Sequence, residues 1–309
     1  MSQIKEPFTK PSLTLDEQAD LLASRGLDIP DRHRLLHYLK FIGYYRLSGY
    51  CLFYQADDFH HFKTGTTFQD VLDLYIFDRE LRLLVMDAIE RIEVAVRSCI
   101  SNTMSLHHGP HWFINESHFI QDDRFRHVEL IAKIKRETGH PNSPTGNAKR
   151  REIFLEHYYS KYNEPALPPC WMVAEVMPIG TWSLVFSHLK DSAMKQEICE
   201  PFEIHYKVMT SWLHTVNYMR NLCAHHLRIW NRSFSITPIK MKKYKKYFSS
   251  SMSFYDQAVV LHILMSVIAD GSRWQKRLAD LFDKHASVPI QAMGFPADWQ
   301  DDQFWRINR

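Results

Sequence analysis

One short stretch of the chain, NYMRNLCAHHLRIWNR at residues 217–232, gathers side chains that can move protons and bind phosphate. Apolar residues separate them at helical spacing, so a helix is expected to carry the group. A metal site, a nucleophilic site, an acid–base site and plain surface decoration are all possible explanations. The polar members are Arg220, Asn221, His225, His226, Arg228, Asn231 and Arg232.

The spacing disfavours a metal site. His225 and His226 are adjacent, which sets them about 100° apart on a helix, and His214 lies too far along the chain. Neither an H-E-x-x-H motif nor a carboxylate at ligand spacing accompanies them. A thiol nucleophile is disfavoured as well, because Cys223 is two residues from His225 and faces nearly the opposite side. We therefore expect neither a metal nor a cofactor.

Acid–base chemistry on a phosphodiester fits the spacing better. Asn221 and His225 are four residues apart and share a helix face, and Arg228 is expected to continue that face. A histidine can transfer a proton near neutral pH, and an arginine such as Arg220 can neutralise the charge that builds on a phosphorane. RNA supplies its own nucleophile, the 2′-hydroxyl, so its cleavage requires no metal-bound water.

The elements around this stretch are predicted to be helices, because the chain has only 10 Gly in 309 residues and many strong helix formers. Thr14 and Glu17 form a capping-box pattern at the start of the first helix. Residues 77–106 form the strongest helix, with a continuous apolar stripe. On another face of that helix, Glu93 and Arg97 are spaced as an ion pair, which is either a solvated surface pair or a support for the site.

Three further segments complete the helical prediction. The apolar run 165–189 is broken around Pro178, and its Glu175 is expected to be either paired with a basic side chain or exposed. Residues 202–231 are expected to form one long helix. Two C-terminal helices separated at Gly271 and then a loose tail rich in Phe and Trp are expected to follow.

Two aromatic and basic segments could contact nucleic acid, although the net charge of +3 is too small to indicate this by itself. One is the tyrosine cluster at residues 44–54, for which packing is the commoner explanation. The other is the lysine-rich segment at residues 239–248, which is either a nucleic-acid contact or a solvated charge run. It carries Lys240, Lys242, Lys243, Lys245 and Lys246, with Tyr244 and Tyr247 among them.

The five cysteines are scattered and never form a C-x-x-C pair, which favours reduced thiols in a cytosolic protein. The first ten residues contain no apolar signal core. The apolar run at residues 257–270 is broken by His262 and is too short to span a bilayer. We therefore expect a cytoplasmic protein without a membrane partner.

Four segments, in this order, resemble the bacterial abortive-infection phage-resistance family of AbiD/AbiF-like proteins: YYRLSGY, FDRELRLLVMDAIERIEVAVRS, PPCWMVAEVMPIGTWSLVFSHL and MRNLCAHHLRIWNR. The resemblance extends over roughly residues 10–232. Within the last segment, Arg220 to His225 resembles the Arg-x-x-x-x-His signature of HEPN ribonucleases. The resemblance implies that Arg220 and His225 are the catalytic pair and Asn221 a polar helper. His226, Arg228, Asn231 and Arg232 match the family's extension of the motif.

This resemblance also implies an all-α, HEPN-like helical bundle with N-terminal and C-terminal helical elaborations. We place an N-terminal extension at residues 1–65, the core at 66–235, and the basic segment with the C-terminal helices at 236–309. Two Arg/His sets usually meet in HEPN proteins, so one motif per chain implies a homodimer. The implied activity is metal-independent cleavage of cellular or phage RNA in phage defence, and a small regulatory RNA or an antitoxin is a possible partner.

Two other functions stay open. A non-catalytic RNA-binding protein could recognise a structured small RNA through the lysine-rich segment and the tyrosine cluster. A purely structural helical dimer could instead use the polar stretch for hydrogen bonds at its interface.

Overall fold

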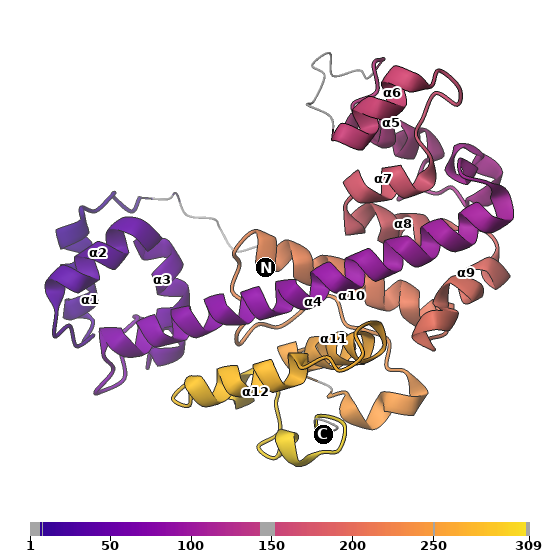
Figure 1. Cartoon of the computed structure of the whole chain (residues 1–309). Coiled ribbons are helices and arrows are strands. Elements are labelled where there is room, and N and C mark those ends of the chain that lie inside the picture. Colours follow the sequence, from indigo (N-terminus) through magenta and orange to yellow (C-terminus); the bar gives the residue numbers. More distant parts are fainter. Residues whose placement is uncertain (1–6, 8, 143–151, 250, 307–309) are drawn as a thin grey trace. The chain divides into compact units, whose positions relative to one another are not determined.

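A computed structural model of the protein describes residues 7, 9–142, 152–249 and 251–306. In this part of the chain, backbone pairing outside helices and turns is limited to isolated bridges, so the all-α prediction is confirmed. The HEPN-like arrangement stays a prediction. The α-helices, labelled in Figure 1, are α1 (Leu15–Ser24), α2 (Arg32–Ile42), α3 (Tyr44–Cys51), α4 (Phe68–His108), α5 (His127–Glu137), α6 (Ile153–Lys161), α7 (Cys170–Val176), α8 (Ile179–His188), α9 (Ser192–Cys199), α10 (Tyr206–Ala224), α11 (Phe254–Ile268) and α12 (Trp274–Lys284).

Short 3₁₀ helices lie between them: η1 (Leu52–Tyr54), η2 (Trp112–Ile114), η3 (Glu116–His118), η4 (Glu200–Phe202), η5 (Lys242–Tyr247), η6 (Ile290–Met293) and η7 (Trp299–Asp301). The chain divides into two compact units. Unit 1 comprises residues 1–81 and 281–288, and unit 2 comprises residues 82–280 and 289–309. The boundaries expected from the sequence, after residues 65 and 235, stay predictions.

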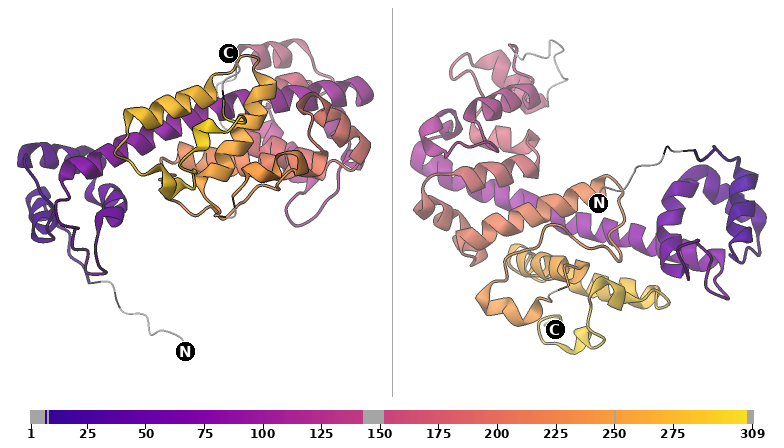
Figure 2. Two further views of the ribbon diagram at one scale, coloured as in Figure 1. Left: turned by 90° about the horizontal axis from the view of Figure 1, so that it is seen from below. Right: turned by 180° about the vertical axis from the view of Figure 1, so that it is seen from behind.

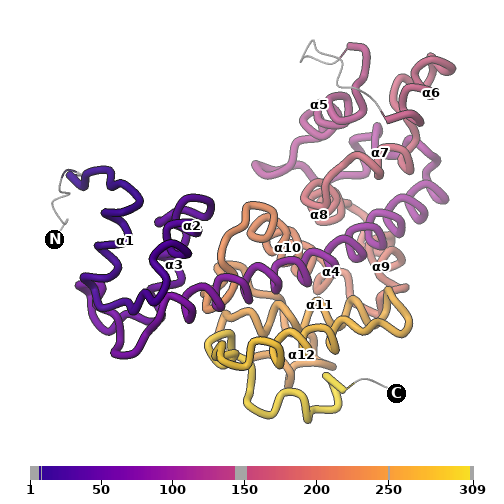
Figure 3. Tube along the Cα trace, turned by 60° about the vertical axis from the view of Figure 1, so that its left-hand side comes forward, coloured from indigo at the N-terminus to yellow at the C-terminus, as the bar shows by residue number. Residues whose placement is uncertain are grey.

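Unit 1 is built on α1, α2 and α3, which follow one another in space as in sequence (Figure 3). The predicted capping box is present: the Thr14 hydroxyl accepts the Glu17 N–H at 3.3 Å, and the Glu17 carboxylate accepts the Thr14 N–H at 2.7 Å. Gly43, at φ +89°, separates α2 from α3, a turn that a residue with a side chain would adopt only under strain. The buried Tyr50 hydroxyl donates to Asp78 at 2.7 Å, which ties α3 to the start of α4.

Unit 2 has a continuous apolar core between the helices. The predicted stripe of α4 is buried at Val85, Ala88 and Ile92. Helix α10 packs against α8, α9 and α11 (Figure 2). Every residue of α11 from 254 to 265 is buried. None of the helices in the described residues combines the length and the apolarity needed to cross a membrane.

The segment after α12 is packed, so the prediction of a loose aromatic tail is wrong. Phe295, Trp299 and Trp305 are each no more than 4% exposed. The Trp305 ring stacks on His262 of α11 at 4.9 Å between centroids. These aromatic side chains cover apolar surface on α11 that would otherwise face water, and that pairing is not visible in either segment alone.

Candidate functional site

The helix that carries the candidate residues ends earlier than the sequence suggests. Helix α10 stops at Ala224, so the prediction of one helix over residues 202–231 is wrong in extent. The Leu227 N–H donates to the Leu222 carbonyl at 2.9 Å, and the His226 N–H donates to the Cys223 carbonyl at 3.0 Å. This is a Schellman turn, in which His226 takes the left-handed position at φ +56° that glycine usually occupies. Without a glycine, the sequence carried no stop signal here.

The turn changes the positions of the predicted residues. Arg220 and Asn221 lie in the last turns of α10, and His225 is its C-cap. The His225 N–H still donates to the Asn221 carbonyl at 3.0 Å, so these two residues lie on the same side of the helix end, as predicted. Arg228 lies beyond the turn, so the expectation that it continues the helix face is wrong.

Burial divides this stretch into an exposed polar part and an apolar anchor. Asn221, His225 and His226 are exposed, and Arg220 is half-buried. The anchor consists of side chains that are at most 4% exposed: Leu222, Cys223, Ile229 and Trp230. The chain on both sides of the turn is therefore held by the core, while the turn presents imidazole and amide groups to solvent.

Beyond the turn, Arg232 ties the chain back to its own backbone and to α10. Its guanidinium donates to the Arg228 carbonyl at 3.3 Å. Burial alone would raise the pKa of Tyr218, but hydrogen bonds from Ser235 and Arg232 lower it below its ordinary value. Asn231 is exposed and takes a positive φ of 45°. These contacts indicate a structural role for Arg232, which the sequence motif alone did not distinguish from a functional one.

Glu93 of α4 links three helices at this site. Its carboxylate accepts the N–H of Ile179, the first residue of α8, at 3.0 Å. Burial raises the pKa of Glu93 above its ordinary value, although the nearby positive charges of Arg97 and Arg220 act in the opposite direction. Glu93 therefore lies near Arg220, as its assignment as a supporting residue requires. The hydrogen bond between Glu93 and Ile179, which are 86 positions apart, could not be predicted from any local pattern in the sequence.

Arg97 of α4 connects this cluster to α7. Its guanidinium donates to the Glu175 carboxylate at 2.9 Å, and the Arg97 side chain is 15% exposed whereas that of Glu175 is 55% exposed. Both expectations for Glu175 are therefore met, because it is paired and also exposed. The ion pair of Arg97 is thus with Glu175, and its positive charge also acts to lower the pKa of Glu93.

A glycine that sequence reasoning did not select brings α8 and α10 together. A Cβ atom at Gly180 would lie 2.8 Å from Oδ1 of Asn217, closer than any normal contact. Asn217 precedes Asn221 by four residues, so both amides are on one side of α10. The signal that could have found this contact is a glycine inside a predicted helix, which often marks a close helix approach.

The lysine-rich segment forms the 3₁₀ helix η5 of unit 2. The Tyr247 ring stacks on Phe304 at 4.2 Å, and Tyr244 lies 6.0 Å from the same ring. Lys240 donates to the Ser249 carbonyl, and Lys243 lies 3.7 Å from the carboxylate of Glu203. The exposed lysines are Lys240, Lys242, Lys243, Lys245 and Lys246. The tyrosines thus anchor the segment to the chain, and the lysines stay exposed even where Lys240 and Lys243 have partners.

The tyrosine cluster of unit 1 divides in the same way. Tyr50 is buried, whereas Tyr45 is 91% exposed. Tyr44 accepts a hydrogen bond from Arg25 at 2.9 Å.

Among the described residues, no three His, Cys, Asp or Glu side chains come together in a way that could hold a metal ion.

Comparison with known proteins identifies one family. The sequence pattern described as "Abi-like protein" matches residues 37–231, a range that includes α10, its terminal turn, Glu93 and Arg97 but not the lysine-rich segment. No curated protein and no solved structure gives a match. Because the match covers more than half of the chain, the protein belongs to the Abi-like family, which supports a role in abortive infection and thus in defence against phage.

Proposed function

We propose that the protein is a metal-independent endoribonuclease that acts through Arg220 and His225 as a homodimer. The observation that carries this proposal is the turn that ends α10. It exposes His225 beside Asn221, while Arg220, one turn earlier, lies near Glu93. A proton-transfer group, an amide and a cation are thus held on one rigid helix end, as acid–base catalysis on a phosphodiester requires.

In the proposed reaction, one His225 imidazole takes the proton of an RNA 2′-hydroxyl. The 2′-oxygen then attacks the adjacent phosphorus, and the bond from phosphorus to the 5′-oxygen breaks. The departing 5′-oxygen takes a proton from the His225 imidazolium of the second copy. The products are a 2′,3′-cyclic phosphate and a 5′-hydroxyl. Arg220 stabilises the phosphorane, since a guanidinium can donate two parallel hydrogen bonds to its oxygens.

Glu93 and Arg97 are positioning residues in this proposal. The half-buried Glu93 carboxylate is fixed by the backbone N–H at the start of α8 and lies close to Arg220. This restricts the Arg220 side chain before substrate binds, which lowers the entropy cost of catalysis. Asn221 orients the imidazole or holds a phosphate oxygen. His226 forms the left-handed turn that ends α10 and takes no part in the proton transfers.

Exposed apolar residues around the site support the homodimer. Trp171 of α7 is 51% exposed and precedes Glu175 by four residues, so the two lie on one helix face. Val94 of α4, next to Glu93, is 44% exposed, and Leu227 of the terminal turn is 45% exposed. Large exposed apolar residues near a polar site are typical of interfaces between proteins.

The dimer is tested by light scattering on Trp171→Asp, with Leu106→Asp as the matched control, because Leu106 is 83% exposed on another part of α4. We expect Trp171→Asp to lower both the dimer fraction and RNA cleavage, and Leu106→Asp to change neither. A wild-type protein that is monomeric and still cleaves RNA would contradict the two-copy mechanism.

The chemistry is tested with purified full-length protein and a single-stranded RNA. We expect cleavage in the presence of EDTA, products with cyclic phosphate ends, and loss of cleavage in His225→Ala and Arg220→Ala. His214→Ala, on an exposed position of the same helix, is the matched control and retains activity. His226→Gly keeps the left-handed turn and should also retain activity. Cleavage by His225→Ala at the wild-type rate would exclude the mechanism.

A second candidate function is RNA binding without cleavage, and the five exposed lysines of the lysine-rich segment favour it. The partner would be a structured small RNA, and such an RNA or an antitoxin could equally restrain the ribonuclease. Steeply salt-dependent binding with no cleavage products, under conditions where the protein is folded and dimeric, would indicate this function instead.

A further inference from the structure

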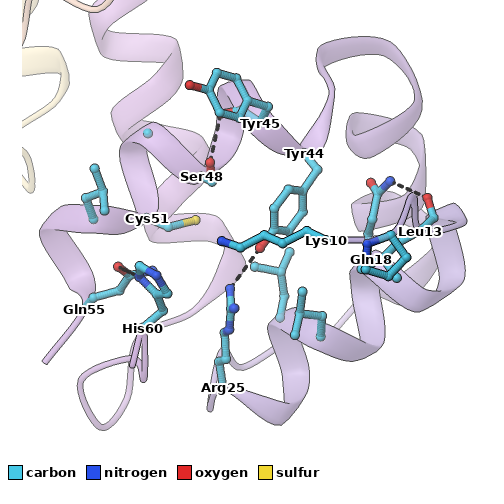
Figure 4. Close-up of a pocket in the computed structure, with 15 residues that line it drawn as sticks. Lys10, Leu13, Gln18, Arg25, Tyr44, Tyr45, Ser48, Cys51, Gln55 and His60 are labelled. Atoms are coloured by element: carbon cyan, nitrogen blue, oxygen red, sulfur yellow. Dashed lines mark hydrogen bonds between the residues drawn. The ribbon is translucent and has the colours of Figure 1, made fainter. Parts of the chain in front are cut away.

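Unit 1 contains a half-open cavity of about 790 Å³ that the proposed ribonuclease does not use. The segment before α1, helices α1 and α3, and the loop after η1 form its walls (Figure 4). Its volume lies within the range of roughly 300–1,000 Å³ that is typical of small-molecule sites.

Aliphatic side chains and one thiol form much of the lining. They include Leu21 and Leu22 of α1, Cys51 of α3 and Leu52 of η1. Burial raises the pKa of the Cys51 thiol to about 12, so this sulfur is uncharged at neutral pH and acts as an apolar surface. The lining therefore favours the aliphatic part of a ligand over a sugar or a base.

The charged side chains that line the cavity are basic. Lys10 and Arg25 both line it, and none of the described lining residues is Asp or Glu. The half-buried Arg25 donates at 2.9 Å to the Tyr44 hydroxyl, a neutral group. Figure 4 shows the Lys10 side chain extending toward the same part of the cavity as the Arg25 guanidinium and the Tyr44 hydroxyl. Lys10 is exposed and Arg25 is half-buried, so two cations directed to one place without a carboxylate favour the binding of an anion there.

We propose that the unit 1 cavity binds a small amphipathic anion, with a carboxylate or phosphate head on Lys10 and Arg25 and an aliphatic body against Leu21, Leu22 and Leu52. Arg25 provides the directional hydrogen bonds and Lys10 a second positive charge. The Tyr44 hydroxyl, already held by Arg25, donates to the same head. This site is independent of the proposed cleavage of RNA, because all of its residues belong to unit 1.

Binding is tested by calorimetry on the full-length protein with decanoate and decyl phosphate, below their micelle concentrations, and with decanol as the neutral analogue. We expect both anions to bind at least about tenfold more tightly than decanol. Arg25→Met and Lys10→Met, which keep much of the aliphatic stem, should each weaken decanoate binding severalfold and leave decanol unchanged. Lys40→Met, an exposed lysine of unit 1 outside the cavity, is the matched control and should have no effect.

A blocking variant tests the location without removing a charge. Gly49 lines the cavity within α3, and an added Cβ would meet no atom within 4 Å. Gly49→Leu should therefore fill part of the cavity, keep the thermal stability of the wild type, and abolish decanoate binding. Equal affinity for decanol and decanoate, tighter binding of adenosine monophosphate than of decanoate, or undiminished decanoate binding in a folded Gly49→Leu protein would each overturn the proposal.

Discussion

The end of α10 and the lysine-rich segment both concentrate positive charge in unit 2, yet they hold it in different ways. Arg220 is half-buried on a packed helix near Glu93, whose carboxylate is itself bonded to the start of α8. The lysines of η5 are exposed, and one of them, Lys243, lies beside the carboxylate of Glu203, whereas the tyrosines between them pack on Phe304. The first arrangement fixes the position of a charge, whereas the second supplies charge without fixing it.

This difference separates two contributions that the proposed ribonuclease would need. Catalysis depends on groups held in one geometry, and a misplaced group loses most of its effect. Attraction of a nucleic-acid backbone depends on the number of cations and is weakened by salt. The α10 end should therefore control the cleavage rate, and the lysine-rich segment should control the affinity. The following predictions test this division.

The largest effect is expected from Arg220→Ala and His225→Ala. Each should lower the cleavage rate by about 100-fold or more, because general acid–base catalysis and charge stabilisation typically contribute factors of this size. RNA affinity and its dependence on salt should stay near the wild-type values. Single-turnover cleavage and equilibrium binding, measured on the same RNA, check the prediction. A loss of affinity as large as the loss of rate would show that Arg220 and His225 do not act mainly on the cleavage step.

Gly180→Ala should destabilise unit 2 by about 1–3 kcal/mol, the usual cost of overpacking. The new Cβ would lie 2.8 Å from Oδ1 of Asn217, so α8 and α10 cannot keep their spacing unless the amide moves. Denaturant unfolding measures the effect. Gly49→Ala, where the Cβ meets open space, is the matched control and should be neutral or stabilising.

The double variant Gly180→Ala with Asn217→Ala sharpens this test. Removing the amide frees the space that the new methyl group needs, so the two changes should not be additive. If the cost of Gly180→Ala persisted unchanged in the Asn217→Ala background, the close approach of the two helices would not be its cause.

Replacing Lys242, Lys243, Lys245 and Lys246 together by Ala should weaken RNA binding by about tenfold near physiological salt and make it less salt-dependent. Each lost contact to a single-stranded phosphate lowers the slope of log K against log salt by roughly 0.7. The cleavage rate at saturating RNA should not change. Titrations at several salt concentrations give the slope, and an unchanged slope would show that these lysines do not contact the backbone.

The smallest effect on stability is expected from Glu93→Gln, although this change should lower the cleavage rate. The pKa of Glu93 is raised in the folded protein, mainly by burial, so the folded state binds this proton more tightly than the unfolded state. The free energy of unfolding therefore falls as pH rises from the ordinary glutamate pKa of 4.5 through the raised value, and the cost is fully present once the pH exceeds that raised value.

Glutamine removes this cost while its amide oxygen can still accept the Ile179 N–H. We expect Tm at pH 7 to be unchanged or raised by less than about 4 °C. The wild type should lose its small disadvantage against Glu93→Gln below pH 4.5. A variant that is strongly destabilised at pH 7 would show that the Glu93 charge stabilises the fold through Arg97 and Arg220.

Much of the helical fold could be predicted from the sequence, but less of the site. The capping box at Thr14, the apolar stripe of α4 and the break at Pro178 follow from local patterns, and the structure contains all three. The end of α10 was missed because His226 occupies the left-handed position without a glycine to mark it. The aromatic tail was predicted to be loose because its packing partner, α11, lies some 40 positions earlier in the chain. The hydrogen bond between His262 of α11 and the Phe304 carbonyl spans that separation.

The sequence by itself determined which residues are close along one helix: Asn221 beside His225, the stripe of α4, and the lysines of η5 interleaved with tyrosines. Such neighbours depend only on the spacing of residues in a regular backbone. Only the tertiary structure decided that Glu93 accepts the Ile179 N–H, that Arg97 pairs with Glu175, and that Gly180 contacts Asn217. These contacts join different helices, and no local pattern records which faces will meet when the apolar stripes are buried.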